Sequence, residues 1–116
     1  LRVENLVPIE ARKAKNVETF FVVMKKFDAE WKARLEAAKK KGHVLRYVAH
    51  IEKKKASVSL REVDSSHPFY SMAGTDNIIA FTTKRYSNTP LVIKGPGAGA
   101  AVTAAGVLAD IFKLTN

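Results

Sequence analysis

Three alternating glycines are the residues of this sequence whose type and spacing best suit a ligand-binding site. Gly95, Gly97 and Gly99 follow the apolar run "LVIK" and lead into the alanine-rich stretch "AAVTAAGVLADIF". Glycine lets the backbone approach a ligand closely, and the first N–H groups of a helix are free to bind an anion. A strand, a glycine turn and a helix in this order predict either a turn that binds nucleotide phosphates or a tight turn that only directs a helix.

The glycine spacing excludes two nucleotide sites that would be complete within these residues. Val102 occupies the position of the third small residue of a dinucleotide fingerprint. The acidic partner of the ribose should follow about 20 residues later, after a second strand, whereas the sequence stops at Asn116. No Gly-Lys-Ser or Gly-Lys-Thr follows the turn, which excludes a P-loop. Four alanines from Ala101 to Ala109 predict a small-residue helix face that packs close to a sheet, and such packing is compatible with ligand binding.

The histidines, the acidic residues and the absence of cysteine indicate no metal site or catalytic centre besides the glycine turn. His43, His50 and His67 lie in separate segments without the spacing of metal ligands, so we expect no metal site. The run "DSSH" from Asp64 holds the residue types of a hydrolytic triad, but triad members converge from separate elements. We interpret it as a capped turn before Pro68. The absence of cysteine excludes disulfides, thiolate catalysis and cysteine metal sites, and is typical of a reducing compartment.

Positive charge dominates the composition. Twenty lysines and arginines against eleven acidic residues give a formal net charge of +9, which favours anionic partners. Two lysine triplets have structural explanations: residues 39–41 precede Gly42 at a helix end, where cations are favourable, and residues 53–55 occupy a solvated turn. No segment interleaves basic and aromatic residues, so we expect no nucleic-acid partner. No apolar run approaches the roughly 20 residues of a membrane span, so we expect no membrane partner.

The N-terminal pattern predicts an extended start, a loop over residues 10–16 and two helices. Asn16 should cap the first helix, whose apolar residues recur at helical spacing and should pack in the core. Asp28 should cap the second helix, which Gly42 should end. The apolar stripe of the first helix consists of Val17, Phe20, Phe21, Met24 and Phe27. The inward residues of the second helix are expected to be Trp31, Leu35 and Ala38.

Alternating apolar and polar residues predict strands in the remainder. Residues 43–52 and 56–63 should form a hairpin around the second lysine triplet. A loop with one helical turn near Tyr70 should follow, and then strands over residues 78–86 and 91–94 joined by the turn "SNTP". The expected inward face of the first strand consists of Leu45, Tyr47, Ala49 and Ile51. The prediction is an α+β fold with a largely antiparallel or mixed sheet and helices packed on one face.

Two long segments together resemble a known family. "GHVLRYVAHIE" and "VDSSHPFYSMAGTDNIIAFTTKRYSNTPLVIKGPGAGAAVTAAGVLADI" are similar to the C-terminal part of homoserine dehydrogenase, in particular the fungal enzyme and the bifunctional aspartokinase–homoserine dehydrogenase. The resemblance runs from Trp31 onward and extends more loosely to the start "VENLVP" and the phenylalanine-rich helix. "GPGAG" before "VTAAGVLAD" is its most specific element, and "LRYV" and "HPFYSMAGTDN" support it.

The resemblance implies an NAD(P)-dependent oxidoreductase. Members reduce L-aspartate 4-semialdehyde to L-homoserine on the route to threonine, methionine and isoleucine, with NADP or NAD as cofactor. A Rossmann domain precedes a catalytic and dimerisation region, and a last helix returns to the Rossmann domain. Residues 1–94 would then be the C-terminal part of the catalytic and dimerisation domain, and residues 95–116 the glycine turn and the returning helix. The final helix should pack on a Rossmann sheet outside this sequence and not in an intramolecular core.

The same resemblance assigns few site residues. Gly99 matches the glycine that family members place against the cofactor, and Gly97 is its weaker neighbour. The catalytic lysine and aspartate of the family lie upstream, so no residue here is assigned a catalytic role, and Lys13 does not match the position of that lysine. We therefore expect part of a longer homodimeric enzyme, inactive alone, in the cytoplasm or, in a plant, in a plastid. The alternative is an independent basic α+β module that binds anions or nucleic acid.

Overall fold

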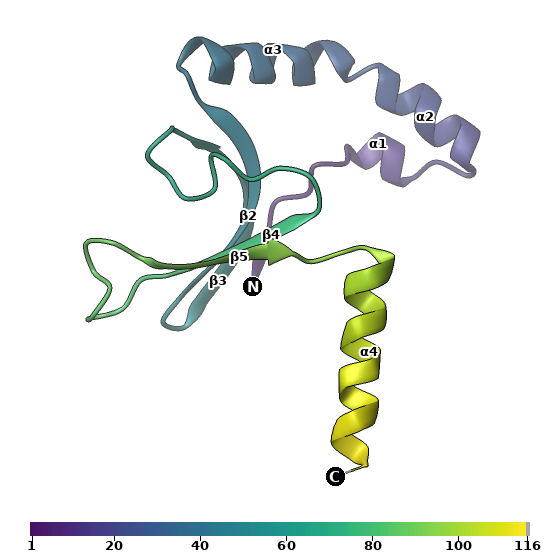
Figure 1. Cartoon of the computed structure of the whole chain (residues 1–116). Helices are drawn as coiled ribbons and strands as arrows, with labels where there is room; N and C mark the ends of the chain where they lie inside the picture. Colours follow the sequence, from purple (N-terminus) through teal and green to yellow (C-terminus); the bar gives the residue numbers. More distant parts are fainter. Residues whose placement is uncertain (116) are drawn as a thin grey trace. The chain divides into compact units, whose positions relative to one another are not determined.

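A computed structural model of the chain describes residues 1–115 (Figure 1). It divides into two compact units, Leu1–Tyr70 and Ser71–Asn116. The elements of the first unit are β1 (Arg2–Val3), α1 (Ile9–Arg12), α2 (Val17–Lys25), α3 (Asp28–Lys40), β2 (Val44–Glu52) and β3 (Lys55–Val63). Those of the second are β4 (Asp76–Phe81), β5 (Leu91–Pro96) and α4 (Ala100–Leu114). The predicted α+β class is confirmed, and the strands form two sheets, β1-β3-β2 and β4-β5.

Local hydrogen bonds set the limits of α2 and α3. The Asn16 side chain accepts the Thr19 N–H at 2.8 Å, which confirms the predicted N-cap. Gly42 ends α3 at φ +72°, where its N–H and that of His43 donate to carbonyls of the last turn, a Schellman motif. The predicted Asp28 cap is wrong. Phe27 holds the N-cap position in a helical conformation without a side-chain cap, because the chain hardly leaves helical geometry between α2 and α3.

Residues predicted as a loop after Pro8 contain the short helix α1. Its turn closes through the Arg12 N–H, which donates to the Pro8 carbonyl at 3.0 Å. Proline suits this position because it has no N–H of its own to lose at a helix start. Ala11 in this turn is buried, so tertiary packing stabilises a helix that the charged sequence did not predict.

The β2–β3 hairpin follows the predicted lysine turn. Glu52 pairs with Lys55, so Lys53 and Lys54 form a two-residue turn, and Lys53 has φ +50°. The strand β1 adds to the other side of β3 in parallel, with Arg2 opposite Ser57. The sheet is therefore mixed, and β2 is one of its edges.

The inward face predicted for β2 is only partly covered. Tyr47 and Ile51 are 49% and 79% exposed, whereas Val48 and Val63 on the opposite face are buried. That opposite face is covered because Arg46 donates to the carbonyls of Phe69 and Tyr70 at 2.8 and 2.7 Å, which fixes the segment after β3 against it. The alternation of apolar and polar residues shows which residues share a face of the strand. It does not show which of the two faces is covered.

The helical core is also smaller than predicted. Ala38 is fully buried, but Leu35 is exposed, and no residue of α2 is buried. Val17 and Phe21 of the predicted stripe are exposed, while its other three residues are half-buried. In the described residues the core consists of Ala11, Ala38, Val48 and Val63.

The second unit holds the glycine turn. Its antiparallel pair runs from Asp76 opposite Pro96 to Phe81 opposite Leu91. The strand β4 starts earlier and ends earlier than predicted, so residues 82–90 form a longer loop, and β5 continues through Gly95. None of the described residues of α4 is buried. No helix in residues 1–115 combines the length and the apolar character that crossing a membrane needs.

Candidate functional site

The start of β4 anchors the turn that joins β5 to α4. Gly97 donates its N–H to the Thr75 carbonyl at 3.0 Å, one residue beyond the last ladder pair, Asp76 with Pro96. Asn77 pairs with Gly95 in the same ladder. Pairing between the consecutive strands β4 and β5 thus fixes where the backbone leaves the sheet, and the predicted turn begins after Pro96 and not at Gly95.

Each of the two predicted site glycines has its own structural reason. A Cβ at Gly97 would overlap the side-chain amide of Asn77 as it stands, so the exposed Asn77 side chain would have to move to make room for one. Gly99 has φ +132° and ψ +148°, a conformation open essentially only to glycine. No atom lies within 4 Å of the place where a Cβ of Gly99 would be. Backbone conformation, and not crowding, therefore requires glycine at position 99.

Gly99 also opens the N-terminus of α4. Its carbonyl accepts the Thr103 N–H at 3.0 Å, the first intrahelical bond, and no side chain caps this end. The first N–H groups of a helix have no intrahelical acceptor and carry partial positive charge. The first turn contains no acidic residue that would repel an anion. These N–H groups can therefore bind an anion.

A lysine beside the turn is already paired. Lys94 Nζ lies 3.3 Å from Asp76 Oδ2 and 3.5 Å from the Ser71 carbonyl oxygen. The ion pair is partly exposed, with the Lys94 side chain 40% and the Asp76 side chain 30% accessible. The carboxylate largely balances the charge of Lys94, which leaves the helix N-terminus as the positive feature of the turn.

Each of the three histidines lies beside a different residue. His43 Nδ1 lies 3.3 Å from Glu62 Oε2, His50 Nε2 lies 3.9 Å from Glu52 Oε2, and the His67 ring packs edge-on against Phe69. Across residues 1–115 no group of three histidine, cysteine or acidic side chains could hold a metal ion.

The "DSSH" run forms the predicted capped turn. Asp64 Oδ1 accepts the backbone N–H of Ser66 at 2.8 Å and also the Ser66 hydroxyl. These hydrogen bonds stabilise the carboxylate and lower the pKa of Asp64 below its ordinary value. The Asp64 carboxylate thus caps its own turn and belongs to no triad.

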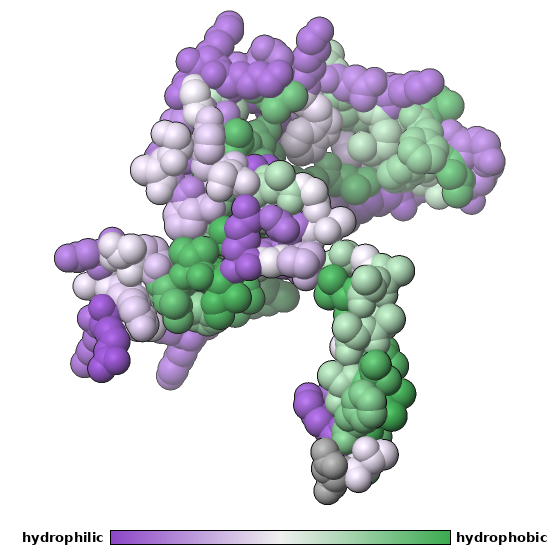
Figure 2. Space-filling view, in the orientation of Figure 1, coloured by the Kyte–Doolittle hydropathy of each residue, from purple (hydrophilic) through white to green (hydrophobic). Residues whose placement is uncertain are grey.

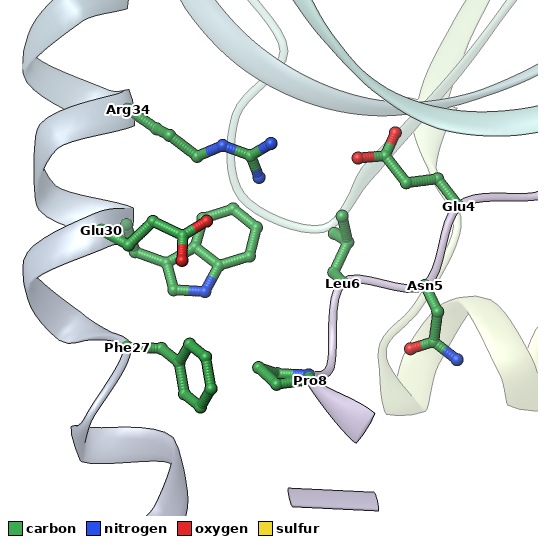
Figure 3. Close-up of a pocket in the computed structure, with 8 residues that line it drawn as sticks. Glu4, Asn5, Leu6, Pro8, Phe27, Glu30 and Arg34 are labelled. Carbon is green, nitrogen blue, oxygen red and sulfur yellow. The ribbon is translucent and has the colours of Figure 1, made fainter. Parts of the chain in front are cut away.

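Sequence reasoning did not find one cavity in the first unit, because its residues come from two separated segments. Its volume is about 290 Å³, and the Arg34 guanidinium lies 5.1 Å from the centre of the Trp31 ring. Arg34 and Glu30 extend from α3 toward the segment that carries Glu4 and Leu6 (Figure 3). The lining residues are Glu4, Asn5, Leu6, Pro8, Phe27, Glu30, Trp31 and Arg34. Charges of both signs around aromatic rings make it a shallow polar cavity.

Comparison with known proteins gives the family. The model of the family described as homoserine dehydrogenase matches residues 4–112. The chain belongs to the homoserine dehydrogenase family. The resemblance inferred from "GPGAG" and "LRYV" is therefore confirmed.

Relatives of both expected types match almost the whole chain. A homoserine dehydrogenase of Schizosaccharomyces pombe is 47% identical over 98% of this chain and 31% of its own length. The chloroplastic bifunctional aspartokinase/homoserine dehydrogenase 1 of Arabidopsis thaliana is 46% identical over 98% of this chain and 13% of its own length. The chain thus spans about a third or less of the curated relatives it matches.

Solved structures share the fold. The crystal structure of a Candida auris protein of unknown function has a TM-score of 0.83 at 40% identity, covering 97% of this chain and 32% of that one. A putative homoserine dehydrogenase from Archaeoglobus fulgidus has a TM-score of 0.56 at 30% identity, covering 71% of this chain and 25% of that one.

Proposed function

We propose that this chain is the C-terminal catalytic-region part of an enzyme that interconverts L-aspartate 4-semialdehyde and L-homoserine with NADP or NAD. The family membership of residues 4–112 supports the reaction. The observation that carries the role of the chain is Gly99, which holds a glycine-only conformation at the uncapped N-terminus of a 15-residue helix. In this proposal Gly99, with Gly97 as its neighbour, borders the cofactor.

The exposed surface of α4 supports the proposed division of the chain. Residues 95–116 would return to a nucleotide-binding domain, while residues 1–94 would belong to the catalytic and dimerisation domain of a homodimer. The face of α4 visible in Figure 2 is largely apolar. The exposed large apolar residues of α4 are Val102, Val107, Leu108, Ile111, Phe112 and Leu114. An exposed apolar surface of this kind is typical of a helix face that packs against another protein surface.

In the proposed reaction the residues of this chain would bind the cofactor and would not carry out the chemical step. Reduction of the aldehyde delivers a hydride to the carbonyl carbon and a proton to the oxygen, and the nicotinamide supplies the hydride when bound. The first N–H groups of α4 would hold an anionic part of the cofactor, and Gly99 would let the backbone approach it. We assign no residue of this chain to the proton transfer and expect the chain to be inactive alone.

The proposed location is the cytoplasm, or a plastid if the source is a plant. The alternative of an independent basic module is not favoured, because the family match accounts for nearly all of the chain. Part of the positive charge is also paired internally, as in Lys41 with Glu62 at 2.9 Å and Lys94 with Asp76 at 3.3 Å.

A hybrid enzyme tests the proposal. This chain replaces the matching segment of the Schizosaccharomyces pombe homoserine dehydrogenase, to which it is 47% identical. We expect the hybrid to oxidise NADPH only when aspartate semialdehyde is present, and the isolated chain to show no turnover. A folded hybrid without turnover would contradict the proposed function, and turnover by the isolated chain would contradict its dependence on the upstream part.

A further inference from the structure

We infer that Asn77 is a positioning residue of the cofactor site, acting through Gly97. The inference rests on the proposed function. It adds a role for a residue of β4, twenty positions before the glycine it contacts.

The register of the β4–β5 pair places Asn77 over the turn. Asn77 is opposite Gly95 of β5, and Gly97 follows two residues later on the same face of the chain, one residue beyond the end of β5. Two glycines on this face leave a gap beside the backbone, and the Asn77 amide occupies the space where a Cβ of Gly97 would lie. The contact is specific to Gly97, since a Cβ at Gly95 would meet no atom within 4 Å.

Shape, and not hydrogen bonding, is the basis of this contact. Within residues 1–115 the Asn77 side chain has no hydrogen-bond partner. The turn itself has a backbone hydrogen bond to the residue that precedes β4, from the Gly97 N–H to the Thr75 carbonyl. Two glycines in three residues make the segment from Gly97 to Gly99 intrinsically flexible. The Asn77 amide therefore restricts the backbone that leads directly into Gly99.

Restriction of this backbone has a functional consequence. A ligand that binds a flexible turn must order it, and that ordering weakens binding. A turn that Asn77 holds in place presents Gly99 and the N-terminus of α4 in a single arrangement. Loss of the Asn77 side chain should weaken cofactor binding while leaving the binding of the aldehyde substrate unchanged.

The first test uses Asn77→Ala and Asn77→Leu in the hybrid enzyme. We expect Asn77→Ala to raise the KM for NADPH about tenfold, with little change in the KM for aspartate semialdehyde or in Tm. Asn77→Leu keeps the branched shape and should restore the KM for NADPH to within a few-fold of the parent. An unchanged KM for NADPH in Asn77→Ala would overturn the inference, as would equal rises in both KM values with a lower Tm. Failure of Asn77→Leu to restore the KM would also overturn it.

The second test does not require activity, so it separates this inference from the proposed function. Gly97→Ala should lower the Tm of the hybrid, and Gly95→Ala is the matched control because its Cβ has room. Combining Gly97→Ala with Asn77→Gly should recover most of the loss in Tm, since the overlapping side chain is gone. Equal losses in Tm from Gly97→Ala in the two backgrounds would overturn the inference even in an inactive hybrid.

Discussion

The two units of the chain differ in how much of their structure they stabilise themselves. The unit Leu1–Tyr70 contains a three-stranded sheet. All four buried residues of the described chain lie in this unit. In the second unit a two-stranded sheet and one long helix contain no buried residue within the described range. Two-stranded sheets are marginal in water on their own. The glycine turn therefore lies in the unit that buries fewer of its own residues.

The largest expected effect concerns Gly99 in the second unit. Valine cannot adopt φ +132° without strain, and such strain costs about 1–3 kcal/mol. Gly99→Val in the hybrid enzyme should raise the KM for NADPH roughly ten- to hundredfold, while urea unfolding of the first unit stays unchanged. Steady-state kinetics with varied NADPH measures the effect, and Gly95→Ala is the control. A normal KM for NADPH in Gly99→Val would break the assignment of the turn to the cofactor site.

The next effect concerns the core of the first unit. Ala38 has no exposed surface, so Ala38→Leu should overpack the core and lower the free energy of unfolding by about 1–3 kcal/mol. Ala29→Leu on the exposed side of the same helix should change it little. Urea denaturation followed by circular dichroism compares the two. Equal effects of both substitutions would show that the first unit lacks the self-contained core described above.

A smaller effect is expected at the start of α2. Asn16→Ala removes the acceptor of the Thr19 N–H and should lower the free energy of unfolding by about 1 kcal/mol. Asn16→Asp keeps a capping oxygen and should retain most of the stability. If Asn16→Asp loses as much as Asn16→Ala, the cap does not stabilise α2.

Features of the fold that depend on neighbouring residues were predicted better than features that depend on tertiary contacts. Asn16, Gly42 and the lysine turn were predicted because their hydrogen bonds and φ values depend on nearby residues. The covered face of β2 was not, because a segment held by Arg46 decides it. The order of strand, glycines and helix predicted the glycine turn, although it begins after Pro96 and not at Gly95. The neighbourhood of Gly97 with Asn77 was not predicted, because no local pattern links the two residues.

The smallest effect is electrostatic. Lys41 and His43 donate to Glu62, and the Lys41 hydrogen bond is the main cause that lowers the pKa of Glu62 below its ordinary value of 4.5. Because the folded pKa is the lower one, this contribution to stability is complete above pH 4.5 and disappears as the pH falls through the folded pKa. Lys41→Met should raise the pKa of Glu62, and Lys40→Met should not. NMR titration of the carboxyl groups distinguishes these outcomes. An unchanged pKa of Glu62 in Lys41→Met would show that the pair of Lys41 and Glu62 does not lower it.

Hydrogen exchange with and without NADPH tests most directly whether the second unit forms one edge of the cofactor site. In the hybrid enzyme, NADPH should slow exchange of the backbone amides from Gly97 to Val102, and the β2–β3 hairpin should be unaffected. The amides of α4 should also exchange more slowly in the hybrid than in the isolated chain, because its apolar surface becomes covered. Unchanged exchange from Gly97 to Val102 at saturating NADPH, in a hybrid that turns over, would contradict the central claim.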